Sequence, residues 1–252
     1  MTLSFTPFTS LSMIQPGDNL AEMIIDAKPA TMGDWLEGDL LVIAQKVISK
    51  AEGRYVRLTD VTPSPEAIEL AKEVDKDPRF VELVLQESVR VVRKRPGVLI
   101  VEHKLGFVHA NAGIDRSNIE HSESQVLLLP QDPDSSAQKL STELSNLVGI
   151  NLPIIINDSM GRAWRNGTLG LAIGVSGLTP LVSHIGEKDI YGRSLEVTEV
   201  AVADELAAAA SLVMGQTTAK IPVVLVRGFR AHQTDRASTR MLIRDAESDL
   251  FR

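Results

Sequence analysis

The chain has 252 residues, of which 44% are hydrophobic and 23% are charged, and its formal net charge is −7. This length allows one large domain or two interlocked lobes with a sizeable core. The acidic balance, without a prominent Lys/Arg run, argues against binding to nucleic acid or to an anionic membrane surface. The absence of cysteine excludes disulfides and thiolate chemistry, and it fits a cytoplasmic protein. We expect neither a signal peptide nor a membrane-spanning segment.

The first half of the chain shows apolar periodicity between turn residues, which is typical of short helices and strands. In chain order we predict a short helix ending at Ala27, a buried strand over 39–44, a helix over 65–74 with Pro65 at its first position, a helix over 78–92, and a hairpin of strands 98–102 and 106–110.

The second half predicts a strand over 126–129, then a helix that opens near Asp132 and ends near Gly149, with Ser135 and Gln138 spaced as a capping box. A buried strand over 152–156 delivers Asn157, Asp158 and Ser159 at its carboxyl end. We further predict a long helix over 195–214 stopped by Gly215, a strand over 222–226, and a helical C-terminal stretch from about residue 232.

Strands and helices alternate without a regular βαβ rhythm, and no repeat or linker marks a domain boundary. We therefore predict a mixed α+β fold in a single domain over 1–252, with two interlocked lobes as an option. The chain carries no Walker A motif, no GxGxxG fingerprint, no HExxH and no GxSxG elbow. A Rossmann or P-loop fold is not expected, and the five histidines show no zinc-ligand spacing.

Carboxylates and small polar groups at the predicted strand ends are the sharpest chemical signal. Asp115 lies in the segment 111–118, and Asp158 with Ser159 in the segment 157–162. Oxygen ligands of this kind suit Mg²⁺ or Mn²⁺, with water and phosphate completing the shell. Aspartates are also common in turns and helix caps, so a purely structural role for Asp115 and Asp158 stays open.

Several cationic and glycine-rich positions suggest phosphate binding or close packing. Arg162, followed by Arg165, suits a phosphate clamp, or else an ion pair to the same aspartates. Lys46 and Lys50 follow a strand and fit mobile phosphate contacts or a solvated surface. The glycine series 167, 170, 174 and 177 lies among strand-forming residues and indicates close packing.

Long segments in a fixed order resemble one family, the coenzyme F420-0:L-glutamate ligases, also called gamma-glutamyl ligases. The segments are VISKAEGR (47–54), NAGIDRSN (111–118), LLLPQDPDSSAQKL (127–140), NDSMGRAWRNGTLGLAIGVSGL (157–178), KDIYGRSLEVT (188–198) and IPVVLVRG (221–228). The resemblance covers nearly the whole chain, although some bacterial relatives carry a fused nitroreductase-like domain that this chain does not show.

The resemblance implies an enzyme that consumes GTP to join L-glutamate to the F420-0 precursor through an acyl phosphate, releasing GDP and phosphate. It implies a mixed α+β fold, an intertwined homodimer and two divalent cations, Mg²⁺ or Mn²⁺, with K⁺ as a further option. Its metal ligands correspond to Asp115 and Asp158 for one ion, and to Ser159 and Gln216 for the other. The implied nucleotide contacts are Leu11, Ser12, Met13, Ile14, Gln45, Lys46, Lys50, Asn118, Met214, Gly215, Gln216, Thr217, Thr218, Ala219, Lys220 and Ile221.

Two departures and two alternatives accompany the resemblance. Gln216 stands where some members carry Glu, and a neutral amide is the weaker metal ligand; Ser159 for Thr is a mild change. The same chemistry on another amino acid or carboxylate acceptor remains open, as does a GTP-binding protein without catalysis. Arg162 is the residue we expect to hold the transferred phosphate.

Overall fold

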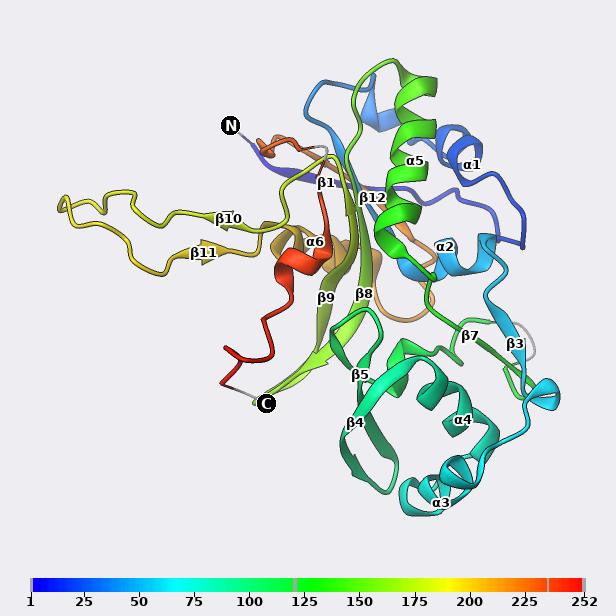
Figure 1. The fold of residues 1–252 in the computed structure, drawn as a ribbon. Coiled ribbons are helices and arrows are strands. Elements are labelled where there is room, and N and C mark those ends of the chain that lie inside the picture. Colours follow the sequence, from blue (N-terminus) through cyan, green and yellow to red (C-terminus); the bar gives the residue numbers. More distant parts are fainter. Residues whose placement is uncertain (1, 120–121, 235, 251–252) are drawn as a thin grey trace.

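The computed structural model describes residues 2–119, 122–234 and 236–250 and shows a mixed α+β fold (Figure 1). Its centre is a five-stranded sheet in the order β1-β12-β2-β8-β9. The strands are β1 (Ser4–Pro7), β12 (Val223–Arg227), β2 (Leu40–Ala44), β8 (Ile154–Arg162) and β9 (Arg165–Ser176). Only β2 and β8 run parallel; their register pairs Leu41 with Ile154 and Ala44 with Asn157.

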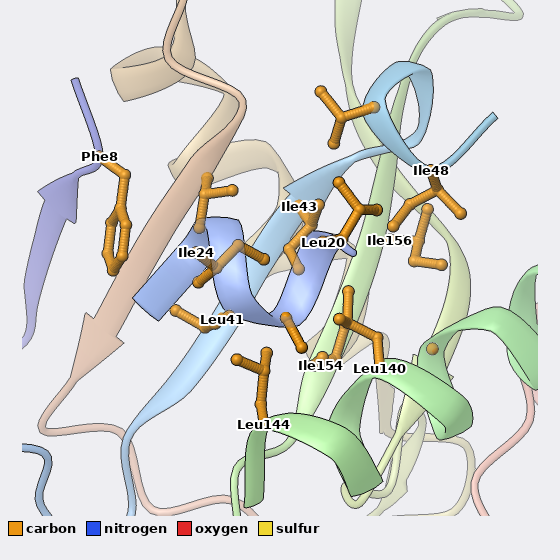
Figure 2. Close-up of a cluster of buried hydrophobic side chains, with 14 of the residues drawn as sticks. Phe8, Leu20, Ile24, Leu41, Ile43, Ile48, Leu140, Leu144, Ile154 and Ile156 are labelled. Carbon is orange, nitrogen blue, oxygen red and sulfur yellow. The ribbon is translucent and has the colours of Figure 1, made fainter. Parts of the chain in front are cut away.

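Helices cover both faces of this sheet. On one face lie α1 (Leu20–Asp26), α2 (Gln45–Ala51) and α5 (Pro133–Val148), and on the other lies α6 (Val202–Met214). Figure 2 shows the first face, where Leu41, Ile43, Ile154 and Ile156 of the sheet meet Leu20, Ile24, Leu140 and Leu144 of the helices. Residues 40–43 of β2 and 154–156 of β8 are buried on both faces, and their sequences are accordingly continuous apolar runs rather than alternating ones.

A second core lies beside the main sheet. It is built from α3 (Pro65–Val74), α4 (Pro78–Gln86), the sheet β4 (Ser88–Arg95), β5 (Val98–His103) and β6 (Val108–Ala110), and the pair β3 (Tyr55–Arg57) and β7 (Gln125–Leu127). Figure 1 shows this smaller lobe beside one end of β8 and β9. The short helix η3 (Asn111–Gly113) follows β6 and packs against β5, β6 and α4, while β6 itself contacts β8 of the main sheet.

A long arm leaves the body between β9 and α6. It carries β10 (Val182–Ser183) and β11 (Glu199–Val200), and its tip extends away from both lobes in Figure 1. Large apolar side chains on it are open to solvent: Ile190 is 91% exposed, Tyr191 83% and Val197 85%. Among the described residues, no helix has the length and apolarity needed to cross a bilayer.

Most predicted elements are confirmed, and four predictions about helices are wrong. The helix over 78–92 stops at Gln86, because β-branched residues after Glu87 pair with β5 as strand β4. The helix over 195–214 begins only at Val202, because the residues before it belong to the arm. Asp132, rather than Ser135, is the N-cap of α5 and accepts a hydrogen bond from the Ser135 amide.

The fourth wrong prediction is the helical C-terminal stretch. Its described part contains only the short helix η4 (Thr239–Leu242); Asp235, Phe251 and Arg252 lie outside the described residues. Ser238 and Thr239 donate hydrogen bonds to the Asp134 carboxylate at the start of α5, and Asp134 also accepts from the Val175 amide. These tertiary contacts, rather than a helical ladder, hold the segment.

Candidate functional site

One cavity of about 960 Å³ opens at the carboxyl end of β2, where its parallel pairing with β8 stops. Gln45 and Lys46 follow β2 directly, while Asp158 and Ser159 come just after the last β2-paired residue of β8. Strand β8 continues past this point as a ribbon with β9. Asp158 and Ser159 therefore lie inside the strand, and the prediction that they follow its end is wrong. Ligands commonly bind at such carboxyl strand ends.

Asp115 reaches the cavity from the loop after β6. Its backbone exchanges two hydrogen bonds with Leu127, N to O at 2.9 Å and O to N at 3.0 Å. Its carboxylate accepts from Gln45 Nε2 at 2.7 Å and pairs with Lys46 Nζ at 3.2 Å. Ser49 Oγ donates to Gln45 Oε1 at 2.9 Å, which turns the Gln45 amide nitrogen toward Asp115.

The two aspartates influence each other electrostatically. Burial raises the pKa of the Asp115 carboxyl; Lys46 opposes this shift, and the charge of Asp158 adds to it. A carboxylate that is desolvated and faces a second carboxylate is stabilised in its charged form by a cation. This pair therefore has the chemistry of a cation site.

A second pair of oxygens lies next to the aspartates. Ser159 Oγ donates to Gln216 Oε1 at 2.8 Å, and the Ser159 amide donates to Asp158 Oδ1, also at 2.8 Å. The separation of Ser159 Oγ and Gln216 Oε1 is that of an ordinary hydrogen bond, and it places two neutral oxygens side by side at the cavity.

Within the described chain, no three His, Cys, Asp or Glu side chains gather closely enough to hold a metal by themselves. The site offers two carboxylates and neutral oxygens instead. Mg²⁺ is characteristically held by one or two carboxylates, with water and substrate phosphates in the remaining positions. The donor set fits a metal that is shared with a phosphorylated ligand.

Loops close the rim of the cavity. Lys50 Nζ donates to Asn118 O at 2.9 Å, Lys46 Nζ to Ser117 O at 3.1 Å, and Asn118 Nδ2 to Thr217 O at 3.3 Å. The loop carrying Asp115 is thereby connected to α2 and to the loop that follows α6. Every residue predicted to contact nucleotide or metal lines this one cavity.

A model of the F420-0:Gamma-glutamyl ligase family matches residues 9–228. The chain belongs to this family. The Coenzyme F420:L-glutamate ligase of Methanothermobacter thermautotrophicus is 44% identical over 253 residues, which is 100% of both chains. The protein of the same name from Methanopyrus kandleri is 42% identical over 255 residues, covering 100% of this chain and 98% of the relative. That from Methanocaldococcus jannaschii is 46% identical over 216 residues, covering 86% and 85%.

Arg162 lies away from the cavity of this gamma-glutamyl ligase family member. It lies near the tip of the β8–β9 ribbon, opposite Arg165 in the strand register, and is not among the residues that line the cavity. Its Nη1 donates to Gly167 O at 3.2 Å. The tip is several residues beyond Asp158, and an extended strand rises about 3.3 Å per residue. Nearness of Arg162 to Asp158 in the sequence therefore does not bring the guanidinium to the two aspartates in this chain.

His109 is one of the cavity residues that the sequence analysis did not predict. It lies on β6, and its Nε2 is 3.2 Å from Asp158 Oδ2. The Phe107 ring contacts the His109 ring edge-on, with centroids 6.3 Å apart. The available sequence signal was the two-residue alternation of a strand. His109 stands two residues after Phe107, so both fall on one face of the predicted strand 106–110, which leads into the segment carrying Asp115.

Proposed function

We propose that this chain is a GTP-dependent ligase that forms an amide between L-glutamate and the coenzyme F420-0 precursor. Its family membership supports an F420-0:glutamate ligase, and three relatives named Coenzyme F420:L-glutamate ligase match this chain over at least 85% of their own length. The observation that carries the proposal is the convergence of Asp115, Asp158, Ser159 and Gln216 on one cavity with Lys46 and Lys50.

The proposed reaction has two steps. A carboxylate oxygen of the precursor attacks the γ-phosphorus of GTP, the bond between that phosphorus and the β–γ bridging oxygen breaks, and GDP leaves. The glutamate amine then attacks the acyl carbon, the C–O bond to phosphate breaks, and the amine gives up its proton as phosphate departs. Activation by phosphoryl transfer turns a poor acyl donor into a good one, and most of the catalysis is positioning and charge stabilisation.

Asp115 and Asp158 would hold one divalent cation, Mg²⁺ or Mn²⁺, and Ser159 and Gln216 a second. The cations would neutralise charge on the phosphoryl oxygens. Lys46 and Lys50 supply fixed positive charge on the same wall of the cavity. The loop of residues 214–221 and residues 11–14 form the remaining wall proposed for the nucleotide. A role for K⁺ belongs to the same proposal, as does a cytoplasmic location, with which a cysteine-free chain agrees.

The proposal includes a homodimer. The arm bearing β10 and β11 presents Ile190, Tyr191 and Val197 to solvent. A lone two-stranded hairpin is marginally stable in water, and grouped exposed apolar side chains mark contact surfaces. A second copy of this chain would bury the arm.

The decisive experiment is a mass spectrum of F420-0 after incubation with the purified protein, GTP, Mn²⁺ and L-glutamate. We expect products heavier by glutamyl residues that depend on GTP. Asp158→Asn should abolish them while leaving the fold intact. Asp204→Asn is the matched control, because Asp204 is a partly buried carboxylate on α6 that accepts only the Ala172 amide in the described chain and does not line the cavity.

Two other results would redirect the assignment. Phosphate release from GTP with a different amino acid or carboxylate acceptor, and none with glutamate, would retain the chemistry and change the substrate. GTP binding without turnover across a panel of acceptors, with a known ligase active in parallel, would indicate a binding protein and contradict the proposal.

A further inference from the structure

Gln45 connects the start of α2 to the candidate metal ligand Asp115. Its Nε2 donates to Asp115 Oδ2 at 2.7 Å, and its Oε1 accepts from Ser49 Oγ at 2.9 Å. Gln45 is 3% exposed, and Ser49 is fully buried. A polar side chain buried to this extent needs partners inside the protein, and Gln45 has one at each end of its amide.

The Asp115 carboxylate decides which end of that amide faces it. An ionised carboxylate only accepts hydrogen bonds, and Lys46 Nζ, 3.2 Å from Asp115 Oδ1, favours the ionised form. Rotation of the Gln45 amide by 180° would place its oxygen beside Asp115 Oδ2, where two acceptors repel each other. Ser49 makes no such selection, because a hydroxyl can donate or accept; it donates here because Oε1 has only lone pairs.

Gln45 and Lys46 hold different oxygens of Asp115 and differ in charge. The Lys46 ammonium repels a cation bound at the carboxylate, whereas the neutral Gln45 amide does not. Lys46 also has a flexible stem and is proposed to contact phosphate, so its bond to Asp115 competes with that role. Gln45 is the buried donor that is able to stay with Asp115 while a cation and a phosphate are bound.

We infer that Gln45 is a positioning residue: its amide holds the Asp115 carboxylate in place for a divalent cation and does not serve the nucleotide directly. The inference rests on the proposed function, because it deepens the assignment of Asp115 to the first cation. It also changes the role that the resemblance implied for Gln45, which was a nucleotide contact. Gln45 lines the cavity, but the polar groups of its side chain are directed to Asp115 and Ser49.

The test compares the binding of Mn²⁺ and of nucleotide in Gln45→Met. Methionine has a similar length and helix propensity but no donor, so α2 should remain folded. Mn²⁺ is titrated with a non-hydrolysable GTP analogue present and is followed by the electron paramagnetic resonance signal of free Mn²⁺. We expect one ion to bind about tenfold more weakly, the usual scale for loss of a group that orients a metal ligand.

Steady-state kinetics give a second readout that separates the two roles of Gln45. In Gln45→Met, turnover should need about tenfold more Mn²⁺, because the weakened ion must be restored by mass action. At saturating Mn²⁺, the KM for GTP should stay within about twofold of the wild-type value, because no nucleotide contact has been removed.

Two further variants separate positioning from general damage. Gln138→Met is the matched control: Gln138 is a helical glutamine on α5 whose Nε2 donates to Thr142 Oγ1 at 3.3 Å, and it does not line the cavity. It should leave Mn²⁺ affinity at the wild-type value. In an Asp115→Ala background, the added Gln45→Met change should alter the remaining Mn²⁺ affinity by less than about twofold, because the carboxylate that Gln45 holds is gone.

Wild-type Mn²⁺ affinity in Gln45→Met, with or without a raised KM for GTP, would overturn the inference and leave the proposed function standing. An equal loss of affinity with and without the Asp115 carboxylate would do the same. If the wild-type protein bound no Mn²⁺ with the analogue and formed no glutamyl product, the proposed function would fail and the inference with it. The wild-type measurement alone therefore distinguishes the two failures.

Discussion

His109 Nε2 lies 3.2 Å from Asp158 Oδ2, while the other oxygen of that carboxylate accepts the Ser159 amide. Both oxygens of Asp158 are thus directed by the chain, one by a strand of the small lobe and one by its own strand. The position of a candidate metal ligand consequently depends on how the two lobes meet.

This contact predicts that two substitutions of His109 differ in their effect on Mn²⁺ affinity. The side-chain amide of glutamine reaches the position of Nε2, and that of asparagine the position of Nδ1. We therefore expect His109→Gln to keep most of the Mn²⁺ affinity and His109→Asn to lose about tenfold, the scale seen when a ligand's partner is removed. Titration of Mn²⁺ against both variants checks this, with His184→Asn, on the distant arm, as control. Equal affinities for the Gln and Asn variants would contradict the geometry.

His103 predicts a pH dependence of folding. Burial, and then the charges of His109, Lys104 and Arg54, lower the pKa of His103 from 6.5 to about 4. Between these values the unfolded chain binds a proton that the folded chain does not, so the free energy of unfolding falls as pH drops from about 7 to 4. The loss attributable to His103 is about 3 kcal/mol.

Replacing His103 by asparagine should remove that part of the pH dependence. Asparagine Oδ1 is able to accept the Leu105 amide, which now donates to His103 Nδ1 at 3.0 Å. Urea unfolding at several pH values measures how steeply the free energy of unfolding changes with pH, and this slope is compared between wild type and His103→Asn. His184→Asn is the comparison variant, and identical slopes for wild type and His103→Asn would count against a buried neutral imidazole.

Gly170 and Gly161 predict opposite outcomes on the same ribbon. A methyl group at Gly170 meets Ala207 O and Ser211 Cβ, whereas one at Gly161 meets nothing within 4 Å. We expect Gly170→Ala to lower the free energy of unfolding by about 1–3 kcal/mol, the cost of overpacking. Gly161→Ala should be close to neutral. Thermal unfolding of the two variants provides the comparison; similar melting temperatures would show that α6 has room to move.

The exposed arm predicts an effect on assembly. Ile190→Asp with Val197→Asp should convert a dimer into a monomer, because charges replace apolar groups that a second copy would bury. Light scattering after size-exclusion chromatography measures the mass directly. Ile68→Asp, at a partly exposed position of α3, is the matched control. A monomeric wild-type protein, or a dimer unaffected by the double change, would remove the arm from the interface.

Local sequence determined those helices and strands whose bounds are marked by nearby residues. Pro65 and Gly149 mark a helix start and a helix end, and the apolar runs of β2 and β8 mark buried strands. The resemblance to the gamma-glutamyl ligases supplied the predicted nucleotide and metal residues, and these residues line the cavity. These features depend on backbone conformation and residue chemistry, which a short stretch of sequence specifies.

Only the tertiary structure decided which residues meet. Strand β4 and the arm contradict local helical patterns, because pairing with β5 and between β10 and β11 outweighs weak propensity. His109 reaches Asp158 across 49 positions of sequence, and Ser159 reaches Gln216 across 57 positions. Arg162, only four residues after Asp158, is carried away from it by an extended strand. Distance along the chain does not measure distance in space once strands pair and helices pack.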